Sequence, residues 1–141
     1  MQYFSKILFV CIGNTCRSQM AEGFARFYGR GKVEVKSAGT SAAGVVNRTA
    51  IEMMKEKGID ISSQTSKQLT GEMLDWADIV VTMGCCSADD LCPVSFRGSK
   101  RDWPIEDPLG KDTGVFRKVR DDIEKRVKEL IGNLLPSGGR G

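Results

Sequence analysis

The sequence predicts an α/β fold, in which a single domain forms an open sheet of parallel strands with helices on its faces. Residues 6–11 (KILFVC) are a lysine followed by a continuous apolar run, typical of a strand buried on both faces of a parallel sheet. A glycine-containing loop and a helical pattern follow, and strand-like and helical segments then alternate. The 141 residues have room for one domain, which we place at residues 1–135, with a flexible tail at residues 136–141.

The segment after the loop predicts a helix and then a second strand. Met20, Phe24 and Phe27 are spaced three or four residues apart, which places them on one helix face, and Gly29 is a suitable end for the helix. Residues 32–37 alternate between apolar and polar side chains, as a short strand does. The order of strand, glycine loop and helix is typical of a phosphate-binding site.

The rest of the chain predicts three more helices and one more strand. Residues 47–57 have a helical pattern closed by Gly58, a residue that tolerates positive φ. A short helix at residues 71–76 precedes the apolar strand 78–83 (DIVVTM). A long helix at residues 115–135 has apolar side chains on one face and charged pairs on the other. Ligands should bind beyond the carboxyl ends of the strands, where their loops converge.

The composition argues against several classes of partner. The net charge of +3, from 21 basic and 18 acidic residues, is small and unclustered for a protein that binds nucleic acid. No apolar run approaches the ~20 residues that span a bilayer. Polar residues follow Cys11 where a signal peptide would continue its apolar stretch. We therefore expect a cytoplasmic protein that binds neither nucleic acid nor membranes, and separately we expect a monomer.

The chain has no histidine, and its five cysteines are Cys11, Cys16, Cys85, Cys86 and Cys92. Without histidine, proton transfer must use a carboxylate, a thiol or water, and the commonest metal ligand is missing. An odd number of cysteines without a secretion signal argues against a structural disulfide framework. We expect reduced thiols, with neither a metal nor a cofactor bound.

The loop between the first strand and the first helix predicts an oxyanion site, with five residues separating Cys11 from Arg17. Backbone N–H groups and the positive end of the helix can hold a tetrahedral anion, while the guanidinium contacts two of its oxygens. This field favours the thiolate of Cys11, a nucleophile to which Ser18 can donate a hydrogen bond. The alternative is a buried strand-end cysteine beside a surface arginine, which the loop's position disfavours. The expected anion-binding residues are Gly13, Asn14, Thr15, Cys16, Arg17 and Ser18.

The segment VCIGNTCRSQMAEGFAR, at residues 10–26, resembles the signature of the low-molecular-weight tyrosine phosphatase superfamily, and closely that of its thioredoxin-coupled arsenate reductases. The similarity extends to about Ile131. It implies a four-stranded parallel open sheet flanked by helices, with Cys11 and Arg17 in the catalytic positions. It also implies that Asn14 holds the loop in shape. A second loop cysteine is common in these relatives without being the nucleophile, so we expect Cys16 to point away from the anion.

Cys85 and Cys92 are separated by six residues, which matches the paired cysteines of the thioredoxin-coupled reductases. The resemblance implies a relay in which Cys11 attacks arsenate, Cys85 attacks the sulfur of the adduct and expels arsenite, and Cys92 then attacks Cys85. Thioredoxin or a similar thiol donor would reduce the final disulfide. Three alternatives stay open: these thiols are ordinary core residues, they bind a metal with Cys11, or Cys86 replaces Cys85.

The Asp107-Pro108 pair resembles the general-acid loop of the family, in which the aspartic acid protonates the departing oxygen. The tyrosine phosphatases usually carry a tyrosine after this pair, whereas the chain has Leu109, which disfavours a phosphotyrosine pocket. Several relatives bind potassium near the loop, with an acidic residue where this chain has Lys67. We hypothesise that the Lys67 ammonium pairs with Glu22 in place of the ion.

These residues favour an arsenate reductase that is recycled by thioredoxin. The main alternative is a phosphatase that hydrolyses phosphotyrosine or small aryl phosphates through a phosphocysteine at Cys11. Both reactions begin with attack by the thiolate, so residual phosphatase activity could accompany reduction. A third hypothesis is a redox sensor or anion-binding module without catalysis, which would need no general acid.

Overall fold

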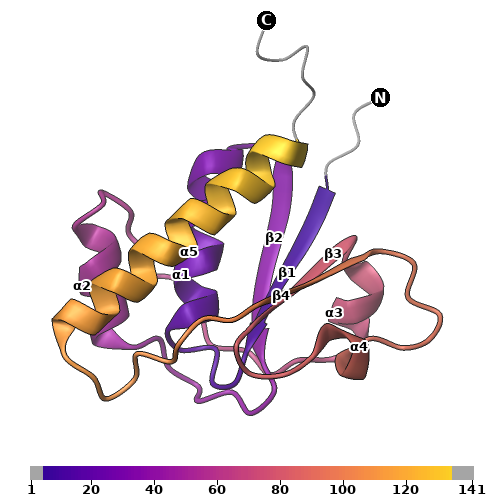
Figure 1. Ribbon diagram of the computed structural model, residues 1–141, viewed down its shortest axis with the longest axis horizontal. Coiled ribbons are helices and arrows are strands. Elements are labelled where there is room, and N and C mark those ends of the chain that lie inside the picture. The colour runs from indigo at the N-terminus through magenta and orange to yellow at the C-terminus, as the bar shows by residue number, and fades with distance from the viewer. Residues whose placement is uncertain (1–4, 135–141) are drawn as a thin grey trace, which may run out of the picture.

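The sheet has four parallel strands, as predicted: β1 (Ser5–Cys11), β2 (Val33–Gly39), β3 (Ile79–Met83) and β4 (Ser99–Trp103). The computed structural model describes residues 5–134, and the tail predicted at residues 136–141 lies outside them. The strand order is β2-β1-β3-β4, so β1 lies inside the sheet and ends at Cys11 beside Gly39 (Figure 1). The strand β2 follows β1 in the chain and lies on one side of it, whereas β3 lies on the other side, so the direction of strand addition reverses at β1. Open α/β sheets bind their ligands at such a switch point.

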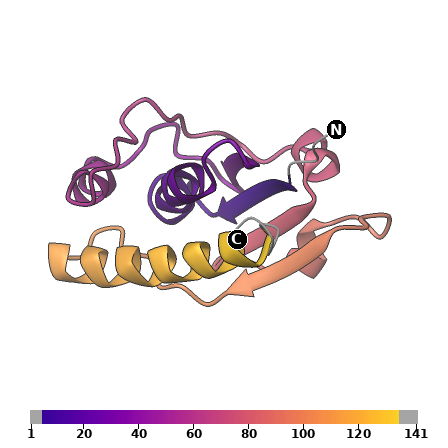
Figure 2. The same ribbon diagram turned by 90° about the horizontal axis from the view of Figure 1, so that it is seen from above.

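Helices cover both faces of the sheet: α1 (Arg17–Gly29), α2 (Arg48–Lys55), α3 (Gly71–Trp76), α4 (Ala88–Leu91) and α5 (Thr113–Leu134). Side chains alternate along β1, so Ile7 and Phe9 pack with α1, α2 and α5, whereas Leu8 and Val10 pack with α3 and α4. Figure 2 shows α1, α2 and α5 grouped on one side of the strands and α3 on the other. Burial on both faces explains the continuous apolar run of β1.

The α1 helix is held against the sheet by side chains that are fully buried. Met20 and Phe24 have no exposed surface, and burying a side chain of this size stabilises a fold by roughly 1.5–3 kcal/mol. Phe27, predicted on the same buried face, is 42% exposed, and that prediction was wrong. The contact falls instead on Tyr28, which packs against the core because residues 20, 24 and 28 advance by four along the helix.

The sequence pattern placed seven elements within two residues of their observed bounds but missed β4 and α4. Only Trp103 is buried in β4, whose sequence SKRDW lies at the edge of the sheet. An edge strand needs no apolar alternation, and exposed charges protect it from pairing with other chains. The α4 helix has only four residues, too few to show a helical period.

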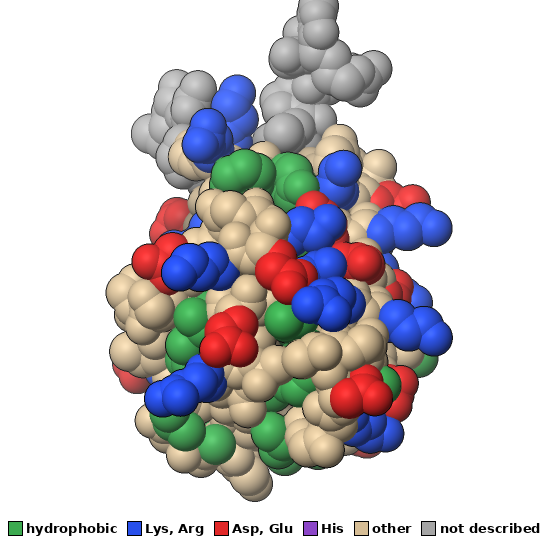
Figure 3. Space-filling model, turned by 90° about the vertical axis from the view of Figure 1, so that its left-hand side faces the viewer, with side chains coloured by type: hydrophobic (Ala, Val, Ile, Leu, Met, Phe, Trp, Pro, Cys, Tyr) green, Lys and Arg blue, Asp and Glu red, His purple; other side chains and the backbone are tan. Residues whose placement is uncertain are grey.

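The surface formed by the described residues carries charges of both signs. Figure 3, which views the molecule from the side of α2 and the start of α5, shows basic and acidic side chains interspersed over this face. No helix within residues 5–134 is long and apolar enough to cross a membrane.

An ion cluster joins α2 to α5 on the same side of the molecule. One carboxylate oxygen of Glu56 accepts from Arg120 Nη1 at 2.6 Å and the other from Arg117 Nη2 at 2.8 Å. Arg120 is 6% exposed and also donates to the carbonyl oxygen of Met53 at 3.1 Å. Hydrogen bonds from the two guanidinium groups lower the pKa of Glu56 to about 2.

This lowered pKa predicts how the cluster contributes to stability. The ionised carboxylate stabilises the fold above the ordinary glutamate pKa of 4.5, and this stabilisation is lost as the pH falls through about 2. We expect Glu56→Gln to lower the melting temperature at pH 7. The difference in melting temperature between the variant and the wild type should become smaller as the pH falls from 4.5 to about 2. Glu52→Gln, an exposed substitution on the same helix, is the control. A constant gap across this range would contradict the assignment.

Candidate active site

The loop from Cys11 to Arg17 is shaped by hydrogen bonds on its outer side. The carbonyl oxygens of Cys11, Ile12, Gly13 and Thr15 accept from backbone N–H groups of the segment 40–47, at 2.8 to 3.0 Å. Among the described residues, no backbone N–H of residues 12–16 donates to another protein group. The carbonyls therefore point away from the loop's centre and the N–H groups stay free, which is the arrangement that binds an oxyanion.

Gly39 allows the strand β2 to pass directly against this loop. A Cβ atom on Gly39 would lie 2.4 Å from the carbonyl oxygen of Ile12 and 2.8 Å from the backbone nitrogen of Asn14. Both contacts are with backbone, which cannot move aside without reshaping the loop. Sequence reasoning missed this residue because a glycine at a strand end carries no sign of the loop it faces.

The side chain of Asn14 is the central support of the loop, as the resemblance implied. Its backbone has a positive φ of 48° and its side chain is fully buried. Its amide oxygen accepts from the backbone N–H of Lys67 at 2.7 Å, which fixes the orientation of the amide. The amide nitrogen then donates to Ser18 Oγ at 2.8 Å and to Ser37 Oγ at 2.9 Å.

Ser18 supports the sulfur of Cys11. The two side chains are buried, and Ser18 Oγ lies 2.9 Å from Cys11 Sγ. Because Asn14 already donates to this hydroxyl oxygen, the hydroxyl proton of Ser18 is free to point at the sulfur. Ser18 is therefore placed to donate a hydrogen bond to the sulfur of Cys11 when this residue acts as a nucleophile.

Arg17 connects the loop to the two segments that complete the site. Its guanidinium is 3% exposed and donates from Nη1 to the carbonyl oxygens of Met83 and, at 3.2 Å, of Ile105. Its Nη2 lies 3.5 Å from Asp107 Oδ2, and the Asp107 side chain is 47% exposed. The structure thus brings the predicted arginine and the predicted general acid together. An aspartic acid here can exchange protons with solvent and reach an anion held by Arg17.

Gly84 makes the contact between these segments possible. It has a positive φ of 78°, and a Cβ atom would lie 2.2 Å from the carbonyl oxygen of Ile105 and 3.0 Å from Arg17 Nη1. A side chain here would displace the guanidinium or the segment that ends in Asp107. Gly84 therefore positions Cys85 at the end of β3 while keeping Arg17 in place.

Cys16 differs from Cys11 although it belongs to the same loop. It is 1% exposed and lies in the core cluster below α1. Burial, together with the negative charges of Asp107 and Cys11, raises the pKa of Cys16 to about 12. It therefore stays protonated at neutral pH, which supports the expectation that it is not the nucleophile.

The other three cysteines lie at the end of β3, next to the loop. A disulfide joins Cys85 to Cys86, and Cys11, Cys16 and Cys92 are free and buried thiols. Cys85 Sγ lies 3.7 Å from the carbonyl oxygen of Val10, the residue before Cys11. The structure therefore brings Cys85 beside the strand that carries the nucleophile, as the sequence predicted. No cluster of three or more potential metal ligands is found in the described part of the chain.

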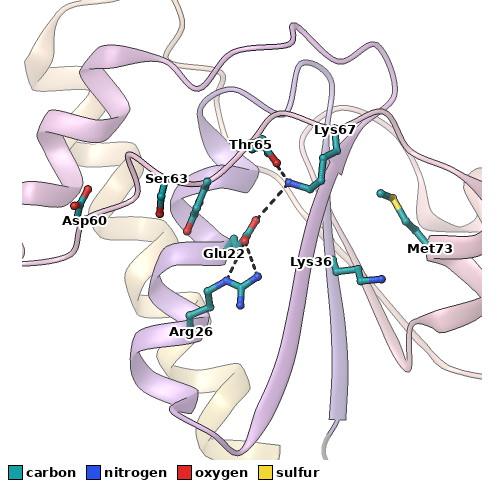
Figure 4. A pocket seen from close by; sticks show the side chains of 9 residues that line it. Glu22, Arg26, Lys36, Asp60, Ser63, Thr65, Lys67 and Met73 are labelled. Carbon is teal, nitrogen blue, oxygen red and sulfur yellow. Dashed lines mark hydrogen bonds and ion pairs between the residues drawn. The ribbon is translucent and has the colours of Figure 1, made fainter.

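A pocket lined mostly by charged and polar residues contains the predicted pair of Lys67 and Glu22 (Figure 4). Lys67 Nζ lies 4.0 Å from Glu22 Oε1 and also donates to the carbonyl oxygen of Thr65, which confirms the pairing. Glu22 is also paired with Arg26 at 2.8 Å and accepts from Ser37 Oγ. Burial lowers the pKa of Lys67, and the charge of Glu22 opposes this shift.

A loop that can hold an oxyanion below a reactive cysteine, at the switch point of a parallel sheet, defines a class of enzyme that attacks oxyanions through a thiolate. The family model described as low molecular weight phosphotyrosine protein phosphatase matches residues 6–137. The chain therefore belongs to this family.

Individual relatives include both reductases and phosphatases. The chain is 46% identical over 130 residues to arsenate reductase 1 of Bacillus cereus, covering 92% of this chain and 96% of that protein. A solved arsenate reductase in its phosphate-binding state is 40% identical with a TM-score of 0.80, covering 94% of this chain and all of that one. An arginine phosphatase from Geobacillus stearothermophilus is 34% identical with a TM-score of 0.81, and the match covers 92% of both chains.

The hydrogen bond between Ser18 and Cys11 can be tested by alkylation. We expect Ser18→Ala to slow the reaction of Cys11 with iodoacetamide at neutral pH by about tenfold or more, since a hydrogen bond to a charged group contributes about 1.5–3 kcal/mol. Mass spectrometry of the tryptic peptide 7–17 reports the modification. Ser66→Ala, which removes a donor to Gly13 on the outer side of the loop, is the control and should react at nearly the wild-type rate. Equal rates in all three proteins would refute the assignment.

The replacement of potassium by Lys67 also remains a prediction. Exchanging sodium for potassium at constant ionic strength should leave the melting temperature of the wild type unchanged, because the ammonium already neutralises Glu22. Lys67→Asp restores an acidic side chain at this position and should make stability depend on potassium. A potassium-specific stabilisation of the wild type would show that the lysine does not replace the ion.

Proposed function

We propose that this protein reduces arsenate to arsenite through thiolate attack by Cys11. The observation that carries the proposal is the presence of further thiols at the end of β3, where Cys85 Sγ lies 3.7 Å from the carbonyl oxygen of Val10. A phosphatase needs a nucleophile, an anion site and a general acid, but no second thiol. The names of the similar arsenate reductases support the same reaction.

The first step forms a bond between sulfur and arsenic. The loop N–H groups and Arg17 hold arsenate, Cys11 Sγ attacks the arsenic atom, and one oxygen leaves as water after protonation. Asp107 is the proposed proton donor, since its carboxyl group lies 3.5 Å from Arg17 Nη2 and is accessible to solvent. Arsenic is still pentavalent in this adduct.

The second step transfers two electrons. The thiolate of Cys85 attacks Cys11 Sγ, the sulfur–arsenic bond breaks, and its electron pair leaves with arsenic as arsenite. A disulfide between Cys11 and Cys85 remains. Cys92 then attacks Cys85 Sγ and releases Cys11 as a thiolate. Because the structure holds Cys85 in a disulfide with Cys86, a reductant must first free Cys85.

The reductant that closes the cycle is an external dithiol such as thioredoxin, acting in a reducing compartment such as the cytoplasm. Approach of this partner requires the 84–93 segment to expose the disulfide. No cofactor resident in the protein takes part in the scheme. We propose that the enzyme acts as a monomer, since all three reacting thiols belong to one chain.

Hydrolysis of aryl phosphates is the second candidate function. A pocket of about 560 Å³ next to the loop is lined by Thr15, Val45 and Leu109 among others, and Val45 is 63% and Leu109 52% exposed. This apolar surface could receive an aryl group, and the name of the similar arginine phosphatase supports a phosphatase reaction as the alternative. Leu109 lacks the ring that would stack on an aryl substrate, so we expect this activity to be residual.

The function is tested by measuring arsenite formation from arsenate, with thioredoxin, thioredoxin reductase and NADPH, in parallel with aryl phosphate hydrolysis. We expect Cys11→Ser to lose both activities. Cys85→Ser and Cys92→Ser should lose arsenite turnover by about a hundredfold or more but keep phosphate hydrolysis, because only reduction uses those thiols. Asp107→Ala should slow both reactions by about 10²–10⁴-fold.

For Cys85→Ser and Cys92→Ser, retained phosphate hydrolysis is the matched control, since a variant that misfolds would lose both activities. Brisk phosphate hydrolysis without arsenite formation in the wild type would replace the reductase by the phosphatase. Turnover that is insensitive to Asp107→Ala would argue against an enzyme that uses this general acid.

A further inference from the structure

Cys86 lies in the candidate site, but the reaction proposed above does not use it. Its sulfur is bonded to that of Cys85, the thiol that must resolve the arsenic adduct. Both residues are half-buried and pack against the apolar cluster around Leu8 and Val10. Cys86 thus touches a reacting atom of the relay without any movement of the chain.

Cys92, in contrast, is separated from Cys85 by a helix that is anchored at its start. The backbone N–H of Ala88 donates to Asp102 Oδ1 at 2.9 Å, and Thr82 donates to the same oxygen. Ser87 caps α4 by accepting from the backbone N–H of Asp89. These contacts hold α4 in place and oppose a movement that would bring Cys92 closer to Cys85.

Cys92 is also poorly prepared to attack. It is 7% exposed and lies at the end of α4, where its backbone N–H donates to the carbonyl oxygen of Ala88, the first residue of that helix. Burial raises the pKa of Cys92, and the carboxylates of Asp89 and Asp102 add to this shift while Lys100 opposes it. The thiolate fraction of Cys92 is therefore small until the segment opens.

We propose that Cys86 is a fourth thiol of the relay and takes the disulfide from Cys11 before Cys92 does. The inference rests on the reductase function proposed above. The thiolate of Cys86 attacks Cys85 Sγ in the Cys11–Cys85 disulfide, the bond to Cys11 breaks, and Cys11 leaves as a thiolate. A bond between Cys85 and Cys86 forms, so the number of disulfides and the electron count are unchanged.

This step separates the release of Cys11 from the formation of the Cys85–Cys92 disulfide. Cys86 releases Cys11 while α4 is still folded, because the sulfurs of Cys85 and Cys86 belong to neighbouring residues. Cys92 attacks Cys85 Sγ later, once α4 has opened, and releases Cys86 as a thiolate. The resulting Cys85–Cys92 disulfide is the form that the external reductant meets. The bonded pair in the structure is then the state between these two steps.

The test uses one turnover of the reduced, full-length protein without any reductant. Cys92→Ser and the double variant Cys86→Ser/Cys92→Ser are mixed with arsenate, quenched in acid, alkylated and digested with trypsin, and released arsenite is measured. Cys11 lies in the tryptic peptide 7–17, and Cys85, Cys86 and Cys92 all lie in peptide 68–97. A disulfide between the two peptides therefore reports Cys11–Cys85, and one within 68–97 reports transfer to Cys86.

We expect Cys92→Ser to release arsenite and to carry its disulfide within peptide 68–97, with Cys11 alkylated. The double variant should release the same amount of arsenite but keep the two peptides linked. A linked pair of peptides in Cys92→Ser would overturn the proposal while leaving the reductase intact. Absence of arsenite from all proteins, including the wild type, would overturn the reductase itself and the proposal with it.

The rate of the step gives a second measurement. Cys86→Ser and Cys86→Ala both retain Cys92, and the arsenite released in the first turnover marks the formation of the Cys11–Cys85 disulfide in each protein. The return of the Cys11 thiol should then be slower by about tenfold or more, because it waits for α4 to open. Wild-type rates of return in both variants would exclude Cys86 from the relay.

Discussion

The buried amide of Asn14 is the constraint on which the rest of the site depends. Its oxygen is fixed by the backbone of Lys67, so its nitrogen must face Ser18 and Ser37. One side chain thereby joins the loop, the end of β2, the segment after residue 64 and the hydroxyl below Cys11. An unpaired amide at this depth would cost about 1–3 kcal/mol, so these partners are held together. This arrangement also holds the hydroxyl of Ser18 next to the reactive sulfur of Cys11.

The sequence was sufficient to predict the half of the site that lies on continuous chain. The strand β1, the loop and α1 form one unbroken segment. Its apolar run, its glycine, its arginine and its helix follow one another in the order that an anion-binding site requires. Contacts between distant segments were not predictable in the same way. Gly39 and Gly84 are needed because of backbone atoms of Ile12 and Ile105, which no local pattern reveals. The strand β4 was missed because an exposed edge does not impose an apolar alternation.

The family and the fold do not by themselves decide the reaction, because similar chains include both arsenate reductases and an arginine phosphatase. Both reactions share attack by a thiolate on a tetrahedral oxyanion, and the loop around Cys11 serves either. The difference is what happens to the adduct: water attacks phosphorus in one case, and a second sulfur attacks the first in the other. Only the second route requires a second thiol close to Cys11. Cys85 follows β3, the strand next to β1, and its Sγ lies near the carbonyl oxygen of Val10.

Five thiols in one small domain can act in sequence only if their surroundings make them unequal. Cys11 and Cys16 are both almost fully buried, yet the hydroxyl of Ser18 lies 2.9 Å from the sulfur of Cys11, while burial raises the pKa of Cys16 to about 12. Burial raises the pKa of Cys92 at the end of α4, whereas Cys85 and Cys86 are half-buried and Cys85 lies next to Val10, the residue before the nucleophile. Thiolate attack requires both ionisation and contact, so burial and helix anchoring restrict which exchange happens first. The order of the chemistry is therefore set by packing, since the five side chains are chemically identical.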